Sequence, residues 1–586
     1  MKMDFEFNFL KDLNEKQKNI CIGNKNYMLI ACPGSGKTRT LTYKLAYMAE
    51  KYRCSRKWNI AITYTNRAAE EIENRLIDMD ISLDNVWTGT IHQFCMHFII
   101  RPYAIYSDRL KFGYKIIDEH VVQKYIKEIV ERRGLKYDYR KNYFECEEIR
   151  FDYKKFIIDK KEIDFDSILD ISNELITKNK FIAEDIANIV RSLYVDEFQD
   201  TNELQYQILG AIVKNNNRIN MLFVGDTNQA IYGNLGGVVK TKNEIEHLMG
   251  QTFEEVFMLD CYRSTQKIID YYNNFAIEYR NICSFYCNSG FNSHICYNHE
   301  VYRNELVDKI VEIIEYDIRR NISEKEICIV APQWYLLFDL SLKLKDRLPH
   351  INFDSPEISP FKPDPLNPFF LMARLIYTVP GKLTVMRKRI ANKILKILEE
   401  EYQLTIDSQI NSSSFLKIVN SYQNNTISGM EYYEQCTKWI LNSIGIEINN
   451  EVALNETLEM FIDNSKSRIN KYNIINTNEN FRTYFCEKSG IVISSIHGIK
   501  GKEYKTIIAF GLLNGLIPHW DFIMKTEMRD LRINETKKLL YVLCSRAKEN
   551  IYLFSEKGRL TKKCHEYIAT NELKELNFCY DVISVQ

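Results

Sequence analysis

Short apolar runs rich in β-branched residues recur near both ends of the chain, and each has the length of one buried strand. These runs lie at 27–32, 58–65, 192–197, 220–226, 326–332, 491–497 and 505–511. Between them lie amphipathic stretches, such as 38–52 and 67–79, whose apolar positions recur with the spacing of a helix that faces a core. Because strands that alternate with helices form parallel sheets, the pattern predicts an α/β core near each end of the chain.

Two long segments interrupt this pattern. Residues 100–185 are mixed, charged and rich in tyrosine, and residues 376–486 are polar with helical spacing, clearest in an amphipathic stretch at 385–404. We expect two mostly helical insertions within the two α/β cores. A proline-rich segment at 348–370 precedes the second insertion and is predicted to form a loop or hinge, since proline removes a backbone donor and breaks helices.

Composition narrows the class of protein. The chain has 586 residues, 45% of them hydrophobic and 27% charged, which is typical of a globular chain with several domains. Lys plus Arg equals Asp plus Glu, 78 against 78, so nucleic-acid binding must be argued from local patches. The 15 cysteines include no CxxC pair, and we find neither a secretory signal nor an apolar run of about 18 residues. We therefore expect a cytoplasmic protein with reduced thiols and no membrane contact.

A glycine-rich loop follows the first predicted strand. The string PGSGKT leads directly into a helical pattern, which is the context that a phosphate-binding loop requires. Gly34 and Gly36 allow the backbone N–H groups to wrap around a phosphate, Lys37 would reach the β and γ oxygens, and Thr38 would hold Mg²⁺. The general pattern begins with glycine, where this chain has Ala31. The loop predicts that a nucleoside triphosphate and Mg²⁺ bind here.

Polar residues at the ends of two later strands complete a hydrolytic site. Asp196 and Glu197 end the run at 192–197, where Asp196 would bind the metal and Glu197 would act as general base. Gln229 follows the run at 220–226, and its amide could orient the attacking water and so sense the γ-phosphate. The sequence therefore predicts a nucleotide hydrolase.

Taken together, the motifs resemble superfamily 1A helicases of the UvrD/PcrA/Rep group, in order and spacing over essentially the whole chain. The matching strings lie at 13–20, 33–38, 61–72, 88–94, 195–200, 224–233, 261–265, 494–504 and 539–550. The resemblance implies two RecA-like parallel-sheet P-loop domains, each with a mostly helical insertion. It also implies an ATP- and Mg²⁺-dependent DNA translocase or helicase that moves 3′ to 5′ on single-stranded or tailed duplex DNA.

The resemblance assigns roles residue by residue. Gln17 would recognise adenine, Tyr262 would stack on it, and Glu503 would contact the ribose, while arginine fingers from the second domain would reach the γ-phosphate. The predicted catalytic residues are Lys37, Glu197, Gln229, Arg263 and Arg546. The predicted nucleotide-binding residues are Gln17, Pro33, Gly34, Ser35, Gly36, Lys37, Thr38, Arg39, Tyr262 and Glu503, with Thr38 and Asp196 on the metal. The predicted DNA-binding residues are Thr63, Asn66, His92, Phe94, Tyr232 and His497.

The same resemblance predicts four domains. Domain 1A would comprise 1–99 and 186–270, domain 1B 100–185, domain 2A 271–375 and 487–586, and domain 2B 376–486. Within 101–160 there are 15 Lys or Arg against 11 Asp or Glu, interleaved with tyrosines. Cations for phosphates and aromatic faces for bases are what single-strand binding uses, although each tyrosine could equally serve in packing.

Departures from the family pattern leave an alternative function open. After the string IYG the family has an aromatic residue and then Arg-Gly-Ala, where this chain has Asn234, Leu235, Gly236 and Gly237, and the second insertion is short. The chain also ends 40 residues after Arg546, without a segment for a fused nuclease. The alternative is a nucleotide-sensing, DNA-binding regulatory subunit of a partner nuclease. Helicase-like subunits of prokaryotic antiviral systems, such as GajB of Gabija, have a similar layout.

Two further interpretations have less support. A P-loop kinase or GTPase would leave Gln17, Tyr262 and the second α/β core unexplained. A zinc site could be formed by a Cys/His cluster, but its spacing fits no zinc module well, and part of it has the alternation of a strand. The members of this cluster are Cys283, Cys287, His294, Cys296 and His299.

Overall fold

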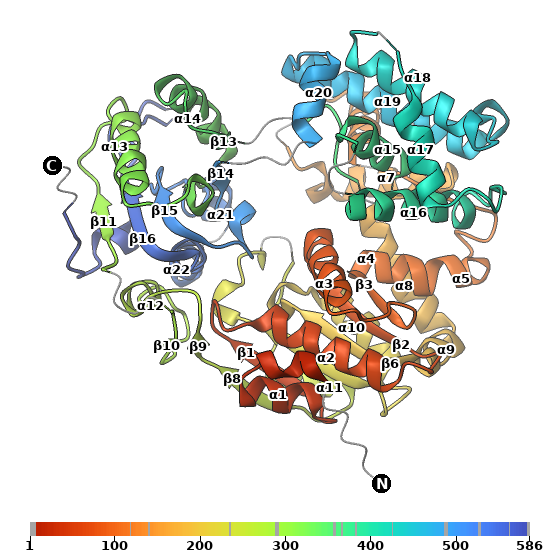
Figure 1. Ribbon diagram of the computed structural model, residues 1–586, viewed down its shortest axis with the longest axis horizontal. Helices are drawn as coiled ribbons and strands as arrows, with labels where there is room; N and C mark the ends of the chain where they lie inside the picture. Colours follow the sequence, from red (N-terminus) through yellow and green to blue (C-terminus); the bar gives the residue numbers. More distant parts are fainter. Residues whose placement is uncertain are drawn as a thin grey trace. The chain divides into compact units, whose positions relative to one another are not determined.

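The computed structural model describes most of the chain as two compact units. It describes residues 7–117, 119–138, 141–233, 236–287, 292–355, 359–364, 367–380, 384–424, 426–485, 490–525, 529–561 and 563–582. The first unit comprises residues 1–352 and 491–586, and the second comprises 353–490. Each unit is described below by itself (Figure 1).

The first unit contains a six-stranded parallel sheet with the order β3-β2-β6-β7-β1-β8. Its strands are β1 (Tyr27–Ala31), β2 (Trp58–Thr63), β3 (Val86–Thr90), β6 (Val190–Asp196), β7 (Asn220–Gly225) and β8 (Glu254–Met258). Strands β1 and β7 are buried along their whole length, as expected for apolar strands covered on both faces. The four strands predicted near the N-terminus are confirmed, and the remaining two, β3 and β8, lie at the edges of the sheet.

Helices flank this sheet (Figure 1). They are α1 (Glu15–Ile22), α2 (Lys37–Lys51), α3 (Asn66–Asp78), α4 (Ile91–Phe94), α5 (Arg101–Tyr103), α8 (Phe165–Lys178), α9 (Lys180–Ile189), α10 (Glu203–Val213) and α11 (Lys242–Met249), with a π-helical turn η2 (Cys95–Ile100). Helix α1 begins with a capping box in which the Asn14 side chain accepts from the Gln17 N–H and the Gln17 side chain accepts from the Asn14 N–H. This cap fixes the start of α1 and the position of Gln17.

The first predicted insertion has a small core of its own. Strands β4 (Lys115–Ile116) and β5 (Glu162–Ile163) pair in parallel beside α6 (Glu119–Arg132) and α7 (Glu147–Asp159). Buried Ile126, Ile149 and Tyr153 belong to the core between these two helices. Helices α8 and α9, predicted as part of the insertion, instead pack their apolar faces into the core of the first sheet, because their buried residues face that sheet.

The second parallel sheet also lies in the first unit. Five of its strands run in the order β11-β16-β15-β12-β14, namely β11 (Ile295–Asn298), β16 (Ala547–Phe554), β15 (Tyr504–Ala509), β12 (Ile327–Ala331) and β14 (Ile491–Ser495). The associated helices are α12 (Gln266–Asn273), α13 (Leu306–Arg319), α14 (Trp334–Arg347), α21 (Trp520–Lys525), α22 (Arg529–Cys544) and α23 (Asn571–Lys574). A short parallel pair, β9 (Asp260–Cys261) and β10 (Cys283–Ser284), follows the last strand of the first sheet. The three predicted strands of this second sheet are confirmed.

The second unit is helical. It opens with β13 (Phe353–Asp354) and continues with α15 (Pro368–Tyr377), α16 (Thr384–Glu400), α17 (Ser412–Ser421), α18 (Gly429–Ser443), α19 (Val452–Tyr472) and α20 (Asn478–Phe485). The unit begins at 353 instead of the predicted 376, because α15 contributes Phe369, Met372 and Leu375 to its core. The predicted fold class, two RecA-like parallel-sheet domains with helical insertions, is confirmed, and the four-domain division remains a proposal.

None of the helices in the described ranges is long and apolar enough to cross a membrane.

Candidate active site

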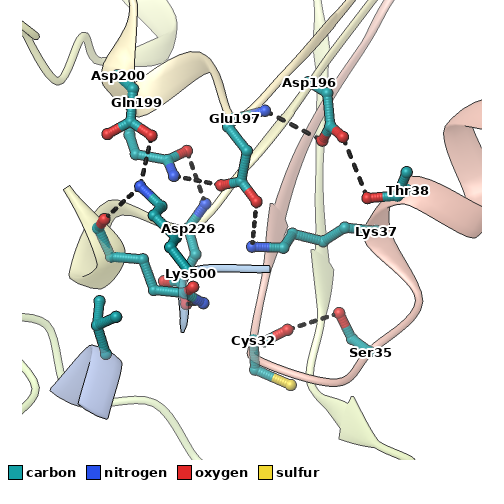
Figure 2. Close-up of polar contacts among 12 residues, drawn as sticks. Cys32, Ser35, Lys37, Thr38, Asp196, Glu197, Gln199, Asp200, Asp226 and Lys500 are labelled. Carbon is teal, nitrogen blue, oxygen red and sulfur yellow. Dashed lines mark hydrogen bonds and ion pairs between the residues drawn. The ribbon is translucent and has the colours of Figure 1, made fainter. Parts of the chain in front are cut away.

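The glycine-rich loop lies between the end of β1 and the start of α2. Gly34 and Gly36 have positive φ angles of +77° and +83°, a region that strongly favours glycine. A Cβ atom on Gly34 would lie 2.5 Å from Cβ of Arg263, and one on Gly36 would lie 2.9 Å from Nε2 of Gln17. The two glycines therefore allow Arg263 and Gln17, distant in sequence, to approach the loop. Ser35 is buried and donates from Oγ to the carbonyl of Cys32 over 2.8 Å (Figure 2).

The acidic pair faces the start of α2 (Figure 2). Thr38 Oγ1 donates to Oδ2 of Asp196 over 3.1 Å, and Lys37 Nζ lies 3.5 Å from Oε1 of Glu197. Burial, together with the neighbouring Glu197 charge, raises the pKa of Asp196 to about 7. Burial acts in the same direction on Glu197, but the charges of Lys37 and Lys500 outweigh it and lower the pKa of Glu197 to about 2.

These residues fit Mg²⁺. The hydroxyl of Thr38 and the carboxylate of Asp196 are hard oxygen ligands and lie within hydrogen-bond distance of each other. Burial, followed by the charge of Glu197, raises the pKa of Asp196, and a divalent cation bound to its carboxylate would favour the charged form. Thr38 and Asp196 are the residues that would hold the ion.

A residue of the second sheet's domain joins the site through Gln229. Arg546 follows α22 and donates from Nη2 to Oε1 of Gln229 over 2.6 Å, while its Nε donates to the carbonyl of Val542 over 3.1 Å. Gln229 in turn donates from Nε2 to Oδ2 of Asp226 over 2.7 Å. Burial, followed by the charge of Arg263, lowers the pKa of Arg546 to about 9.

Arg263 reaches the site from the loop after β9. Its Nε lies 2.7 Å from Oε2 of Glu503, and its Nη1 donates to the carbonyl of Ser545 over 3.1 Å. Glu503 also lies 3.2 Å from Lys548, and although burial acts to raise its pKa, the two cations lower it overall. The predicted γ-phosphate and ribose ligands, Arg263 and Glu503, are thus paired with each other.

The predicted base-binding residues surround the same loop. The Tyr262 N–H donates to the carbonyl of Gly34 over 3.0 Å, and its hydroxyl accepts from Nδ2 of Asn14 over 2.9 Å. Tyr262 is 43% exposed, so a nucleobase could reach its ring. Gln17 donates from Nε2 to the carbonyl of Ser35 over 3.2 Å. Asn14, which sequence reasoning missed, therefore links Tyr262 to the helix that carries Gln17.

Two further predicted residues lie beside the loop. Arg39 is exposed on the first turn of α2 and donates to the carbonyl of Asp12 over 3.0 Å. Pro33 is buried between β1 and the glycines. All the predicted nucleotide-binding residues are therefore grouped around the loop, and their roles in binding remain proposals.

Lys500 was not among the predicted site residues, yet it contacts three residues of the matching strings. Its Nζ lies 2.5 Å from Oδ2 of Asp200, donates to the carbonyl of Gln229 over 2.9 Å, and lies 4.8 Å from the ring centre of Tyr232. Burial raises the pKa of Asp200 to about 6, an effect that Lys500 opposes. The signal was its place in the string HGIKGKEY, between the predicted residues His497 and Glu503.

Aromatic rings lie beside Lys500 on the predicted DNA side of the site. Tyr232 stacks on Tyr64 with ring centres 4.6 Å apart and an angle of 24° between the ring planes. The His497 ring lies 5.8 Å from Tyr232, so two predicted DNA-binding residues are neighbours. Tyr64 is 36% exposed, and it was missed although it lies within a matching string.

The structure places the other predicted DNA-binding residues in different surroundings. Thr63 ends β2 and Asn66 begins α3, where Oδ1 of Asn66 is buried without a hydrogen-bond partner among the described residues. His92 lies on α4 with its ring 5.7 Å from Phe165. Phe94 is only 1% exposed and packs in the core of the first sheet, so the structure does not bring it to a surface that a strand could touch.

The altered residues after the third motif are only partly described. Asn234 and Leu235 lie outside the described residues, whereas the Gly237 N–H donates to the carbonyl of Tyr232 over 3.2 Å. Gly236 has a positive φ of +87°.

The Cys/His cluster does not form a metal site in the described ranges, where no group of three or more His, Cys, Asp or Glu side chains could hold an ion. Cys283 and Cys287 are exposed, whereas Cys296 is buried on β11, the strand that the sequence had indicated. His299 stacks beside Tyr297, and His294 lies beside Tyr316.

Family models match both halves of the chain. The model described as the UvrD/REP helicase N-terminal domain matches residues 13–155 and 136–249, which include the loop and the acidic pair. The model described as the UvrD-like helicase C-terminal domain matches residues 392–558, which include Glu503 and Arg546. Together these matches cover more than half of the chain.

Individual relatives agree with these models. A probable DNA helicase II homolog of Mycoplasma capricolum is 23% identical over 670 aligned positions, covering 98% of this chain and 88% of the relative. ATP-dependent DNA helicase PcrA of Bacillus subtilis is 28% identical over 222 positions, covering 32% of this chain and 29% of the relative. DNA helicase II of Escherichia coli is 26% identical over 246 positions, covering 37% and 34%. With both family models matched in order around a loop, acidic pair and arginine that meet in one site, the chain belongs to the UvrD-like DNA helicases of superfamily 1A.

Proposed function

We propose that the chain is an ATP- and Mg²⁺-dependent DNA translocase that moves 3′ to 5′ on single-stranded DNA and displaces the complementary strand. The observation that carries the proposal is the hydrogen bond from Arg546 to Gln229, which joins the second sheet's domain to the loop-bearing domain at the acidic pair. The direction of movement rests on the family resemblance alone.

The residues of the site divide the hydrolytic step among them. The backbone N–H groups of the loop would hold the phosphates, and Lys37 would leave Glu197 to contact the β and γ oxygens. Oε1 of Glu197 would then accept a proton from a water oriented by Gln229, as the water oxygen bonds to the γ-phosphorus and the bond to the ADP oxygen breaks. Mg²⁺, held by Thr38 and Asp196, would supply positive charge to the phosphate oxygens.

The two arginines would offset the charge that develops on the transferred group. Arg546 already contacts Gln229, and Arg263 would exchange its contact with Glu503 for the γ-phosphate. Arg546 follows α22 in the second sheet's domain, and Arg263 follows β9 in the segment that connects the two sheets. Nucleotide binding would therefore draw the two sheets' domains together, and release of phosphate would let them separate.

The structure also suggests how DNA would be sensed. Lys500 contacts the carbonyl of Gln229 on one side and the ring of Tyr232 on the other. A DNA strand that stacks on Tyr232 or contacts His497 would therefore act on Lys500, which contacts Gln229, the residue that would sense the γ-phosphate. Contacts there would be mainly to base faces and backbone, so sequence preference should be weak.

ATP hydrolysis measured with and without single-stranded DNA tests this proposal, beside displacement of strands from duplexes with 3′ or 5′ tails. We expect DNA to stimulate hydrolysis and displacement to require the 3′ tail. Displacement from the 5′ tail alone would contradict the direction, and GTP hydrolysis in preference to ATP would contradict the base assignment.

The partner nuclease remains a separate proposal, supported only by the shortness of the second insertion and the altered residues after the third motif. Hydrolysis without displacement, together with copurification of a nuclease with the tagged chain, would favour the regulatory role. Displacement by the purified chain alone would favour the autonomous helicase.

A further inference from the structure

The backbone of Glu197 adopts a conformation that its residue type disfavours. Its φ of +53° and ψ of +47° place it in the left-handed region, which costs a residue with a Cβ atom about 1–2 kcal/mol. Such a conformation persists only where the surrounding structure holds it, and it is common at active sites. A contact that fixes Glu197 from outside the acidic pair is therefore expected.

Gln199 makes that contact. Its side chain is buried, with 1% exposed, and Nε2 donates to Oε2 of Glu197 over 2.5 Å (Figure 2). Its Oε1 accepts from the backbone N–H of Asp226 over 3.1 Å. Since a carboxylate accepts and a backbone N–H donates, the two partners fix which way the amide points. Gln199 therefore connects the loop after β6 with the end of β7.

The surroundings leave this amide little freedom. A Cβ atom on Gly225 would lie 2.2 Å from Oε1 of Gln199 and 2.6 Å from Cδ1 of Phe198. The last residue of β7 is therefore glycine at the place where the Gln199 side chain passes over the strand. Close packing of this kind holds a side chain in one rotamer.

Asp226, the second partner of Gln199, is connected to Arg546 through Gln229. The Oδ2 atom of Asp226 accepts from Nε2 of Gln229, and Oε1 of Gln229 accepts from Arg546. Asp226 is itself fully buried and paired with Arg280 at 3.0 Å. A continuous chain of hydrogen-bonding residues thus runs from Glu197 through Gln199, Asp226 and Gln229 to Arg546.

We propose that Gln199 is a positioning residue for ATP hydrolysis, which holds the Glu197 carboxylate through Oε2 and connects it to the Asp226–Gln229–Arg546 chain. This inference rests on the proposed ATP hydrolysis. Because Gln199 occupies Oε2, the other oxygen, Oε1, which now faces Lys37 at 3.5 Å, is the atom left to take the proton from water. In this role Gln199 would act through Glu197 and would itself contact neither the nucleotide nor the attacking water.

The test compares Gln199→Glu with Gln207→Glu. The first variant keeps an acceptor for the Asp226 N–H but replaces the donor to Glu197 with a carboxylate. The second makes the same chemical change at an exposed position on α10. With saturating single-stranded DNA, we expect Gln199→Glu to lower kcat at least about 30-fold while the KM for ATP changes by less than about threefold, since positioning contacts act in the transition state. Gln207→Glu should retain the wild-type values.

A reciprocal exchange keeps the test valid if the single variant folds poorly. Glu197→Gln combined with Gln199→Glu again places one donor opposite one acceptor, with their order reversed. We expect the double variant to regain the melting temperature that Gln199→Glu loses, while its hydrolysis stays at the level of Glu197→Gln alone. This stability measurement needs no hydrolysis, so it separates failure of the inference from failure of the proposed function. Wild-type kcat in Gln199→Glu, or no recovery of stability in the double variant, would overturn the inference.

Discussion

Arg546 and Gln229 are 317 positions apart in the sequence, and their side chains meet over 2.6 Å at the acidic pair. Arg546 enters from the end of α22 and Gln229 from the turn after β7. The contact joins the domain of one parallel sheet to that of the other at the proposed hydrolytic site. Loss of this link should affect hydrolysis more than folding.

Replacement of Arg546 tests that link. We expect Arg546→Lys to lower DNA-stimulated ATP hydrolysis by about 10³-fold, because lysine cannot reproduce the planar contact of a guanidinium finger. Steady-state hydrolysis is the measurement. Arg319→Lys, an exposed position at the end of α13, is the control and should hydrolyse ATP at the wild-type rate. Equal rates for the two variants would show that Arg546 does not act on the phosphate.

Lys37→Ala should abolish hydrolysis. The ammonium group is the only part of the loop that can bring a full positive charge to the β and γ oxygens, so we expect a loss of at least about 100-fold. Lys51→Ala, at the exposed end of the same helix, removes an equal charge and should have little effect. Retention of activity in Lys37→Ala would place the phosphates elsewhere.

Two glycines with positive φ, one in the loop and one elsewhere, distinguish the effect of backbone strain from that of a steric clash. Gly34→Ala adds a Cβ atom 2.5 Å from Arg263, whereas Gly113→Ala has a similar positive φ of +89° but open space around it. We expect backbone strain to cost each variant about 1 kcal/mol of stability, with a further loss in Gly34→Ala from the clash with Arg263, and only Gly34→Ala to abolish ATP binding in a fluorescent-nucleotide titration. Comparable ATP binding by the two variants would contradict the geometry described for the loop.

The stacked tyrosines should couple DNA to hydrolysis. Tyr232→Ala removes the ring that contacts Tyr64 and Lys500, and loss of base stacking of about 1–3 kcal/mol should weaken single-stranded DNA binding about 5- to 150-fold. Hydrolysis without DNA should change little. Tyr279→Ala, at a ring that is 76% exposed, serves as control. A variant that binds DNA as the wild type does would place the strand elsewhere.

Stability should depend on pH through a buried carboxyl group outside the site. Asp317 on α13 is fully buried, accepts from Oγ1 of Thr506 over 2.5 Å, and burial raises its pKa from 3.8 to about 6. A raised pKa means that the folded state favours the protonated acid. Its contribution to stability is therefore complete below pH 4 and is lost as the pH rises through 6.

The difference in unfolding free energy between the wild type and Asp317→Asn isolates this effect. That difference should fall by about 1–3 kcal/mol between pH 4.5 and pH 7.5, since one pKa unit corresponds to about 1.4 kcal/mol. Denaturant titrations at the two pH values provide the measurement. A difference that is constant or rises with pH would mean that Asp317 titrates normally.

The fold could be predicted where the apolar pattern is strong. Strands such as β1 and β7 are buried on both faces and show as unbroken apolar runs. Strand β8 was not predicted because it lies at an edge of the sheet, where most of its residues remain exposed, and because it begins with two glutamates and shows no long apolar run. Helices α8 and α9 were assigned to an insertion because no sequence pattern shows which core an amphipathic helix will cover.

The site shows the same limit. The predicted nucleotide-binding residues lie around the loop, because the matching strings include the loop and the strand ends beside it, and their roles stay predictions. Asn14 and Lys500 were missed, since their contacts with Tyr262 and Asp200 join positions far apart in the sequence. Gln199 was missed although it lies two residues from Glu197, because the sequence does not show that its amide also reaches Asp226. Phe94 was predicted as a DNA contact from its place in a string, although its apolar side chain packs inside the protein.

The most direct test of the account is ATP hydrolysis by the purified chain with Mg²⁺, measured with and without single-stranded DNA, together with strand displacement from a 3′-tailed duplex. The account predicts that DNA stimulates hydrolysis, that the 3′ tail supports displacement, and that Arg546→Lys eliminates both. ATP hydrolysis that DNA does not stimulate, or no hydrolysis at all by a folded chain, would contradict the account.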